Sequence, residues 1–114
     1  MLSRDAQEFA DEIKSHYWSD AHKRRDRAGH RPEDDTQGKR VPEDELLTAG
    51  ETNALRFNVM VVTLQVLKYR DPNLDIHEYA LACGVDAHDG EVQYGLRNLG
   101  GALDSPGRKL LTDA

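Results

Sequence analysis

The sequence predicts an all-α protein, and three observations lead to that fold class. Apolar residues near the N-terminus recur every three or four positions, which is the period of one helix face. A second apolar stretch, residues 54–67, lacks a period of two and is too long for a typical strand. Asp75, Gly84 and Asp89 stand where the ends of two more helices are expected. We therefore expect a small helical bundle.

Residues 3–27, within an N-terminal section 1–27, predict a long amphipathic helix. Ser3 is the expected N-cap and Asp5 lies in the first turn, where negative charge suits the helix dipole. Gly29 and Pro32 would end the helix. Such a helix can lie across a bundle or pair with a second copy in a homodimer. Its apolar stripe consists of Leu2, Ala6, Phe9, Ile13 and Tyr17.

Residues 28–44 predict a polar, mobile connector. Almost nothing in this segment is apolar, and glycine and proline interrupt it repeatedly. A connector of this length is unusual in a small domain, which indicates mobility or a function. Residues 45–114 then form the helical bundle, and the whole chain makes one domain. A short helix is expected over residues 42–49, with Gly50 ending it.

The next helix is the hydrophobic centre of the chain and is expected to run from a cap at Thr52 or Asn53 to about Tyr69. A helix that is apolar almost all round is expected to lie between other helices. The β-branched residues within 59–66 also suit a buried strand, so that alternative stays open. The few polar residues form two narrow stripes, Arg56/Thr63/Arg70 and Asn58/Gln65.

Residues 76–99 have the outline of a helical hairpin. The first helix would span 76–83, capped by Asp75 and ended by a left-handed Gly84 with Val85 packing behind it. The second would span about 89–99, capped by Asp86 or Asp89, with an inner face of Val92, Leu96 and Leu99. This pattern resembles a helix-turn-helix at the level of the motif, although the turn is about two residues longer than usual. A last short helix is expected over residues 107–112.

The helix-turn-helix resemblance implies a DNA-binding transcription regulator, which is the alternative function. Its base and phosphate contacts would come from Gln93, Tyr94, Arg97 and Asn98, with a basic arm at residues 23–31. The leading turn of that helix is acidic, however, and DNA-reading helices need cations near phosphates. The charge therefore favours a different class of partner.

Charge and composition favour protein binding over catalysis. The net charge is −6, and residues 71–114 hold eight acids against three bases. An acidic surface favours a basic partner and repels phosphates and acidic membranes. The five histidines lack a dense Cys/His pattern, and no phosphate-binding glycine loop is present, so no metal, cofactor or enzyme activity is predicted. The single Cys83 suits a reducing compartment, so we expect a cytoplasmic protein.

The leading expectation is a small acidic adaptor or regulatory protein that binds another protein, one with a basic surface. A nucleic-acid-binding protein is one such partner, because carboxylates could stand where phosphates would sit. Trp18 is expected opposite the apolar stripe of the first helix, as the anchor of an interface. The predicted partner-binding residues are Tyr17, Trp18, Arg24, Arg25, Arg27, Asp86, Asp89 and Glu91.

Overall fold

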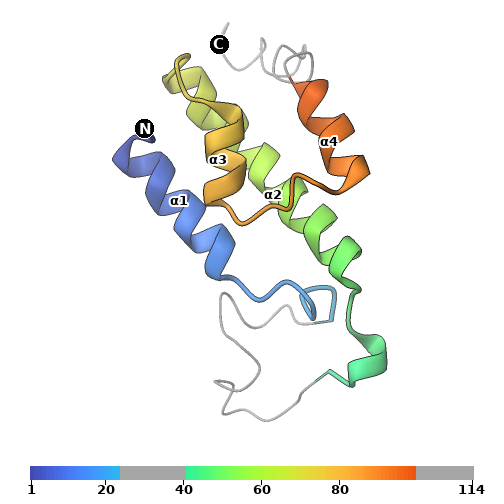
Figure 1. The fold of residues 1–114 in the computed structure, drawn as a ribbon. Coiled ribbons are helices and arrows are strands. Elements are labelled where there is room, and N and C mark those ends of the chain that lie inside the picture. Colours follow the sequence, from blue (N-terminus) through green and yellow to red (C-terminus); the bar gives the residue numbers. More distant parts are fainter. Residues whose placement is uncertain (24–40, 100–114) are drawn as a thin grey trace, which may run out of the picture.

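The computed structural model describes residues 1–23 and 41–99, and the regular elements in this part of the chain are all helices. It contains α1 (Arg4–Ser15), a short 3-10 helix (Glu43–Glu45), α2 (Ala49–Arg70), α3 (Ile76–Ala82) and α4 (Gly90–Arg97). The long α2 forms the centre, with α1 and α3 packed on it and on each other, and α4 packed mainly on α2 (Figure 1). The predicted all-α class is confirmed for these residues.

Helix α1 begins as predicted but ends much earlier. The Ser3 side chain accepts a hydrogen bond from the backbone N–H of Ala6 at 3.2 Å, which confirms the N-cap. The predicted continuation to residue 27 is wrong, because the helix ends at Ser15 with His16 as its C-cap. The indole N–H of Trp18 donates to the carbonyl of Ile13 at 2.8 Å. That bond satisfies a carbonyl that the end of the helix leaves unpaired.

The buried face of α1 is narrower than predicted. Ala6 and Ile13 are buried as expected, and Ala10, which was not in the predicted stripe, is buried with them. Phe9 lies at the edge of this face and is 48% exposed. Two alanines four residues apart let α1 approach α2 and α3 closely. The helix therefore lies across the bundle, which was one of its two predicted uses.

Helix α2 starts before the predicted caps. Thr48 is the N-cap: its hydroxyl accepts from the Glu51 N–H at 3.1 Å, and the Glu51 carboxylate accepts from the Thr48 N–H at 2.9 Å. This capping box replaces the predicted caps, Thr52 and Asn53, and carries the helix through Gly50, which was expected to end a preceding helix. Only the 3-10 turn forms in that preceding segment. Residues 59–66 are helical, so the strand alternative is wrong.

The boundaries of α3 and α4 follow the predicted caps. Asp75 accepts from the Glu78 N–H at 3.0 Å, and the Asp89 carboxylate caps α4. Gly84 has φ of 79°, with the Gly84 N–H bonded to Leu81 O and the Val85 N–H bonded to Ala80 O. This is a Schellman motif, which only a left-handed residue can close. Residues 100–114, including the predicted last helix, lie outside the described part, as does the connector up to residue 40.

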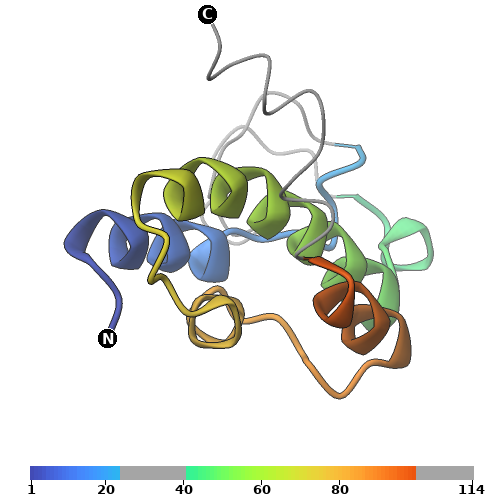
Figure 2. The ribbon, with the colours of Figure 1, turned by 90° about the horizontal axis from the view of Figure 1, so that it is seen from above.

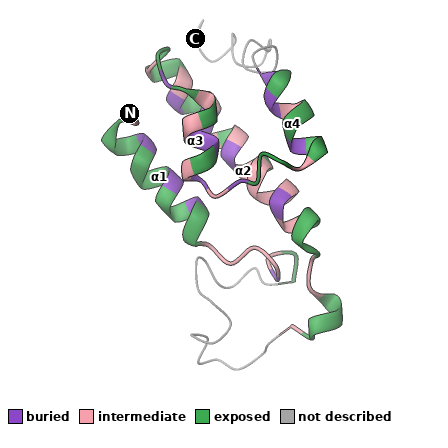
Figure 3. Ribbon diagram, in the orientation of Figure 1, coloured by how far each residue is buried: buried purple, intermediate pink, exposed green. Residues whose placement is uncertain are grey.

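The core lies where α1, α2 and α3 meet. Tyr79 of α3 and Met60 of α2 are completely buried there, and Val92 and Leu96 of α4 extend the core along α2, as predicted for its inner face. The buried residues lie along the sides on which the helices face one another (Figure 3). Seen from above, α3 and α4 lie on the same side of α2 (Figure 2). The two helices of the predicted hairpin are thus held mainly through α2.

Candidate functional site

The first candidate surface is the α3–α4 corner, residues 84–91, together with the outer face of α4. Its backbone is fixed from α2. The Asn53 side chain accepts from the Asp86 N–H at 2.7 Å and donates to the Asp86 carbonyl at 3.0 Å. Nη1 of Arg56 donates to the Gly84 carbonyl at 3.0 Å. Three hydrogen bonds from α2 therefore hold the backbone of the corner in a defined shape, although most of the corner is neither helix nor strand.

Two carboxylates of this corner already have structural roles. One oxygen of Asp86 accepts from the His88 N–H at 2.9 Å. One oxygen of Asp89 accepts from the N–H groups of Glu91 and Val92, at 3.0 and 3.3 Å. In each case the carboxylate keeps a second oxygen that these bonds do not use. Glu91 points from the first turn of α4 and is exposed. The three predicted acidic contacts therefore lie close together along the chain, at a helix start.

The outer face of α4 carries the residues predicted for DNA contact. Gln93, Tyr94, Arg97 and Asn98 are all exposed, and Tyr94 is exposed to 70%. The side-chain amide of Asn98 donates to the Tyr94 carbonyl at 2.8 Å. The acidic residues predicted to bind a protein and the residues predicted to contact DNA thus lie in one continuous stretch, residues 86–98. Both predictions concern the same surface.

The N-terminal candidate residues are arranged differently from the prediction. Tyr17 and Trp18 follow α1 in a non-helical segment and are half-buried. The Trp18 ring lies against His16, with ring centroids 4.2 Å apart, and it packs on the core. The expectation that Trp18 points away from the apolar stripe on a continuous helix is therefore wrong. Lys23 does not lie at a helix end, and the cations Arg24, Arg25 and Arg27 lie outside the described residues.

Segment 16–23 is tied to the chain that precedes α2. The Leu47 N–H donates to the Ser19 carbonyl at 2.8 Å. A ring nitrogen of His22 lies 2.9 Å from the Glu45 carbonyl. No local pattern in the sequence indicates these contacts, because they join positions more than 20 residues apart. They bring Tyr17 and Trp18 to the side of the molecule where the 3-10 helix lies.

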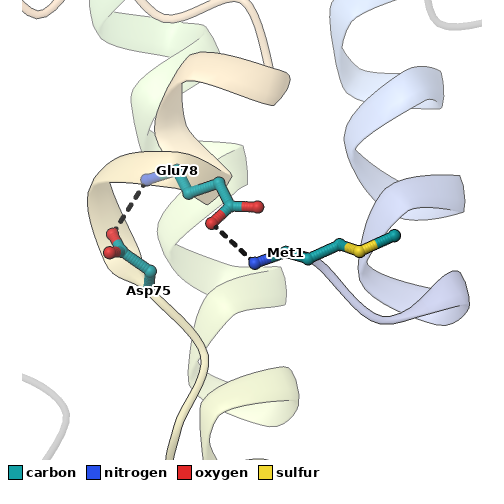
Figure 4. A network of polar contacts seen from close by, with 3 residues as sticks. All are labelled: Met1, Asp75 and Glu78. Carbon is teal, nitrogen blue, oxygen red and sulfur yellow. Dashed lines mark hydrogen bonds and ion pairs between the residues drawn. The ribbon is translucent and has the colours of Figure 1, made fainter.

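A surface ion pair joins the first residue to α3. The amino group of Met1 lies 3.2 Å from Oε2 of Glu78, whose backbone N–H also donates to Asp75 (Figure 4). The amino group is fully exposed and Glu78 is partly so. Solvent and salt screen such pairs strongly, so this contact adds little to stability. It indicates no binding chemistry of its own.

A buried polar cluster lies in the core beneath α3. Thr63 donates to the Met60 carbonyl at 2.9 Å, and the Tyr79 hydroxyl lies 2.8 Å from Oγ1 of Thr63. Burial raises the pKa of the Tyr79 hydroxyl above its usual value, and it raises the pKa of the nearby Cys83 thiol to about 11. A buried thiol that stays protonated at neutral pH is a poor nucleophile. This cluster stabilises the fold and offers no reactive group to solvent.

The described residues offer neither a cluster of metal ligands nor a membrane-spanning helix. Within residues 1–23 and 41–99, no three histidine, cysteine, aspartate or glutamate side chains gather as a metal site requires. No helix of the same part of the chain has the length and apolar character needed to cross a membrane.

A second candidate surface was missed at the level of sequence. On α2, Val62, Val66 and Tyr69 are exposed to 66%, 54% and 56%. The sequence led us to expect a helix covered on all sides, but the described helices cover only part of it. The spacing of 62, 66 and 69 places these residues on one helix face. This spacing could have indicated the exposed face from the sequence. The other faces of the helix are apolar as well, so this one did not stand out.

Comparison with known proteins gives no match: neither a family model, nor a curated protein sequence, nor a solved structure is similar to this chain. The function must therefore be argued from the two surfaces themselves.

Proposed function

We propose that this protein is a small adaptor or regulatory module that acts by binding another protein through the α3–α4 corner and the outer face of α4. The observation that carries the proposal is the combination of a fixed backbone with exposed recognition groups. Asn53 and Arg56 hold the corner from α2, so little ordering entropy is lost on binding. Tyr94 stands 70% exposed beside the acidic turn, and tyrosine is enriched at binding hot spots.

The charges of this surface favour a partner with a basic patch. Asp86, Asp89 and Glu91 are spaced over six residues, and each can offer a carboxylate oxygen to an incoming cation. Arg97 at the far end of α4 is the one basic side chain of that helix. Electrostatic complementarity of this kind contributes mainly to association rate and specificity. A basic partner surface can belong to a protein that binds nucleic acid, with these carboxylates in place of phosphates.

The test begins with a photo-reactive phenylalanine derivative placed at Tyr94 in the native cells, which captures whatever contacts α4. The captured protein is then purified and its dissociation constant measured against the wild-type chain and against D86N/D89N/E91Q. Asparagine keeps the side-chain oxygens that accept the backbone bonds at 86 and 89, so the fold is retained. We expect the triple variant to bind about tenfold more weakly, and the loss to shrink at high salt.

Asp75→Asn is the matched control, because Asp75 also caps a helix but lies at the start of α3, outside the proposed surface. It should bind as the wild type does. If the captured protein binds the triple variant and the wild type equally well, the acidic corner is not the recognition surface and the proposal fails.

The alternative, a DNA-binding regulator, is supported by the exposure of Gln93, Tyr94, Arg97 and Asn98 on one helix. Titration of the protein into labelled random-sequence duplex DNA, at about 50 and 200 mM salt, separates the two functions. Binding that weakens steeply with salt would favour the alternative. The acidic start of α4 leads us to expect no binding even at the lower salt.

A further inference from the structure

The outward face of α2 carries an apolar stripe that the described helices leave open. The stripe consists of Leu55, Val59, Val62, Val66 and Tyr69. The last three are more than half exposed, whereas Leu55 and Val59 are half-buried and Val59 also packs against the core. Figure 2 shows α3 and α4 together on the other side of α2. An exposed apolar face of this extent on the longest helix marks an interaction surface. It is separate from the α3–α4 corner.

The spacing of the stripe is that of a helix–helix seam. Its members follow one another at intervals of four, three, four and three residues, the alternation that lets two helices pair along a line. The stripe extends over about 21 Å at the helical rise of 1.5 Å per residue. A helix that faced only water would place charged residues here. From residue 55 to residue 67 the only charged residue is Arg56, which donates to Gly84.

We propose that a second copy of this chain covers the stripe, with the two α2 helices antiparallel about a two-fold axis. A two-fold interface sets one patch against itself, so the patch must be self-complementary. The α2 stripe meets this condition along its middle, because its members and Asn58 and Gln65 along one edge are uncharged. Arg56 and Arg70 lie along the other edge. No like charges meet along its middle.

The charges at the two ends of α2 select the antiparallel arrangement. Glu51 lies in the first turn and Arg70 in the last, where Lys68 also lies and donates to the Pro72 and Leu74 carbonyls. Antiparallel pairing brings the acidic end of one helix near the basic end of the other, whereas parallel pairing brings like charges together. With residue 51 beside residue 70 of the other copy, Val59 lies opposite Val62 and Leu55 lies opposite Val66. The four positions from Leu55 to Val66 are then matched with one another, and Tyr69 at the end of the stripe lies opposite Thr52.

The test is the mass of the full chain in solution, measured by sedimentation and light scattering from about 1 to 200 µM, a range suited to a small interface. We expect twice the chain mass of 12.8 kDa at the upper concentrations. V62K/V66K should give the monomer mass, with its circular dichroism unchanged because both positions are exposed and lysine is the better helix former. The matched control is L81K, at an apolar position on α3 that is 75% exposed, and it should remain a dimer.

A spin label tests the direction of pairing. Cys83 is buried, so a cysteine introduced as Gly50→Cys, where nothing lies within 4 Å, takes the label selectively and leaves Glu51 and Arg70 in place. Antiparallel pairing separates the two labels by about 30 Å, whereas parallel pairing brings them to about 10 Å. A short distance overturns the antiparallel arrangement. A monomer at every concentration overturns the dimer, and a V62K/V66K variant that still dimerises overturns the assignment to α2.

Discussion

The amide of Asn53 and the backbone of Asp86 bind each other in both directions. Oδ1 of Asn53 accepts from the Asp86 N–H at 2.7 Å, and Nδ2 donates to the Asp86 carbonyl at 3.0 Å. The Asn53 side chain thus acts as the neighbouring backbone that the corner lacks, and it does so from a buried position on α2. The proposed recognition surface depends on this pair, because the pair fixes where the acidic turn lies.

Replacing Asn53 by alanine should destabilise the fold by about 2 kcal/mol, since two hydrogen bonds are lost and two partly buried backbone groups are left unpaired. The free energy of unfolding from urea denaturation measures the effect. Asn58→Ala on the exposed face of the same helix is the control, because both substitutions gain the same helix propensity. An equal stability for the two variants would show that the Asn53 pair contributes nothing.

The helix ends at 75, 84 and 89 could be predicted from sequence because they depend on local chemistry. A capping carboxylate bonds to N–H groups two or three residues away, and Gly84 closes a turn on its own helix. The same logic was available for the start of α2, where Thr48 and Glu51 form a capping box. The predicted start of α2 is wrong because it treats Gly50, which lies between these two residues, as the end of a preceding helix. A single glycine in a first turn costs little there.

Neither the end of α1 nor the exposure of the α2 stripe could be predicted from neighbouring residues alone. The helix ends at Ser15 where the Trp18 indole bonds to Ile13 and the chain that follows is tied to Leu47, a contact across 28 residues. The candidate site was predicted in part, since residues 86–98 do form one surface. Its fixed shape comes from Asn53 and Arg56, whose partners lie some 30 residues away and leave no mark on the pattern of α2.

The capping box of α2 gives the second prediction. Thr48→Ala removes the hydroxyl that accepts from the Glu51 N–H and should lower the free energy of unfolding by about 1 kcal/mol. Thr48→Ser keeps the acceptor oxygen and should remain within about 0.5 kcal/mol of the wild type. Urea denaturation of the three proteins checks both values. If serine and alanine are equally destabilising, then the hydroxyl has no capping role and the boundary depends on packing.

Gly84 and Gly50 should respond to alanine in opposite directions. At Gly84 the backbone has φ of 79°, and a Cβ would lie 3.0 Å from Cγ of Lys14, so Gly84→Ala should cost about 1 to 2 kcal/mol. At Gly50 nothing lies within 4 Å and the backbone is helical, so Gly50→Ala should stabilise by a few tenths of a kcal/mol, less than the roughly 1 kcal/mol expected in a helix interior. Thermal and urea denaturation measure both. A neutral Gly84→Ala would mean that the Schellman turn can rearrange at no cost.

The buried thiol of Cys83 makes stability depend on alkaline pH. Its pKa rises from an ordinary value near 9 to about 11 in the folded protein, because burial disfavours the thiolate. Below the unfolded pKa both states hold the proton, so this group leaves stability unchanged there. Between those two values the unfolded chain loses the proton first, and the free energy of unfolding therefore falls as pH rises, by at most about 1.4 kcal/mol per pH unit.

Cys83→Ala isolates this contribution, since it removes the titrating group and leaves the other ionisable groups in place. Its overall stability will be lower because of the cavity, but its curve of unfolding free energy against pH should be flatter than that of the wild type from about pH 9 to 11. Tyr79, whose pKa is raised from 10.0 by the same burial, adds a further decline in both proteins from about pH 10 upward, so it does not affect the comparison. Parallel curves for the two proteins across that interval would mean that the thiolate forms as easily in the fold as in the unfolded chain, and that the core at Cys83 admits water.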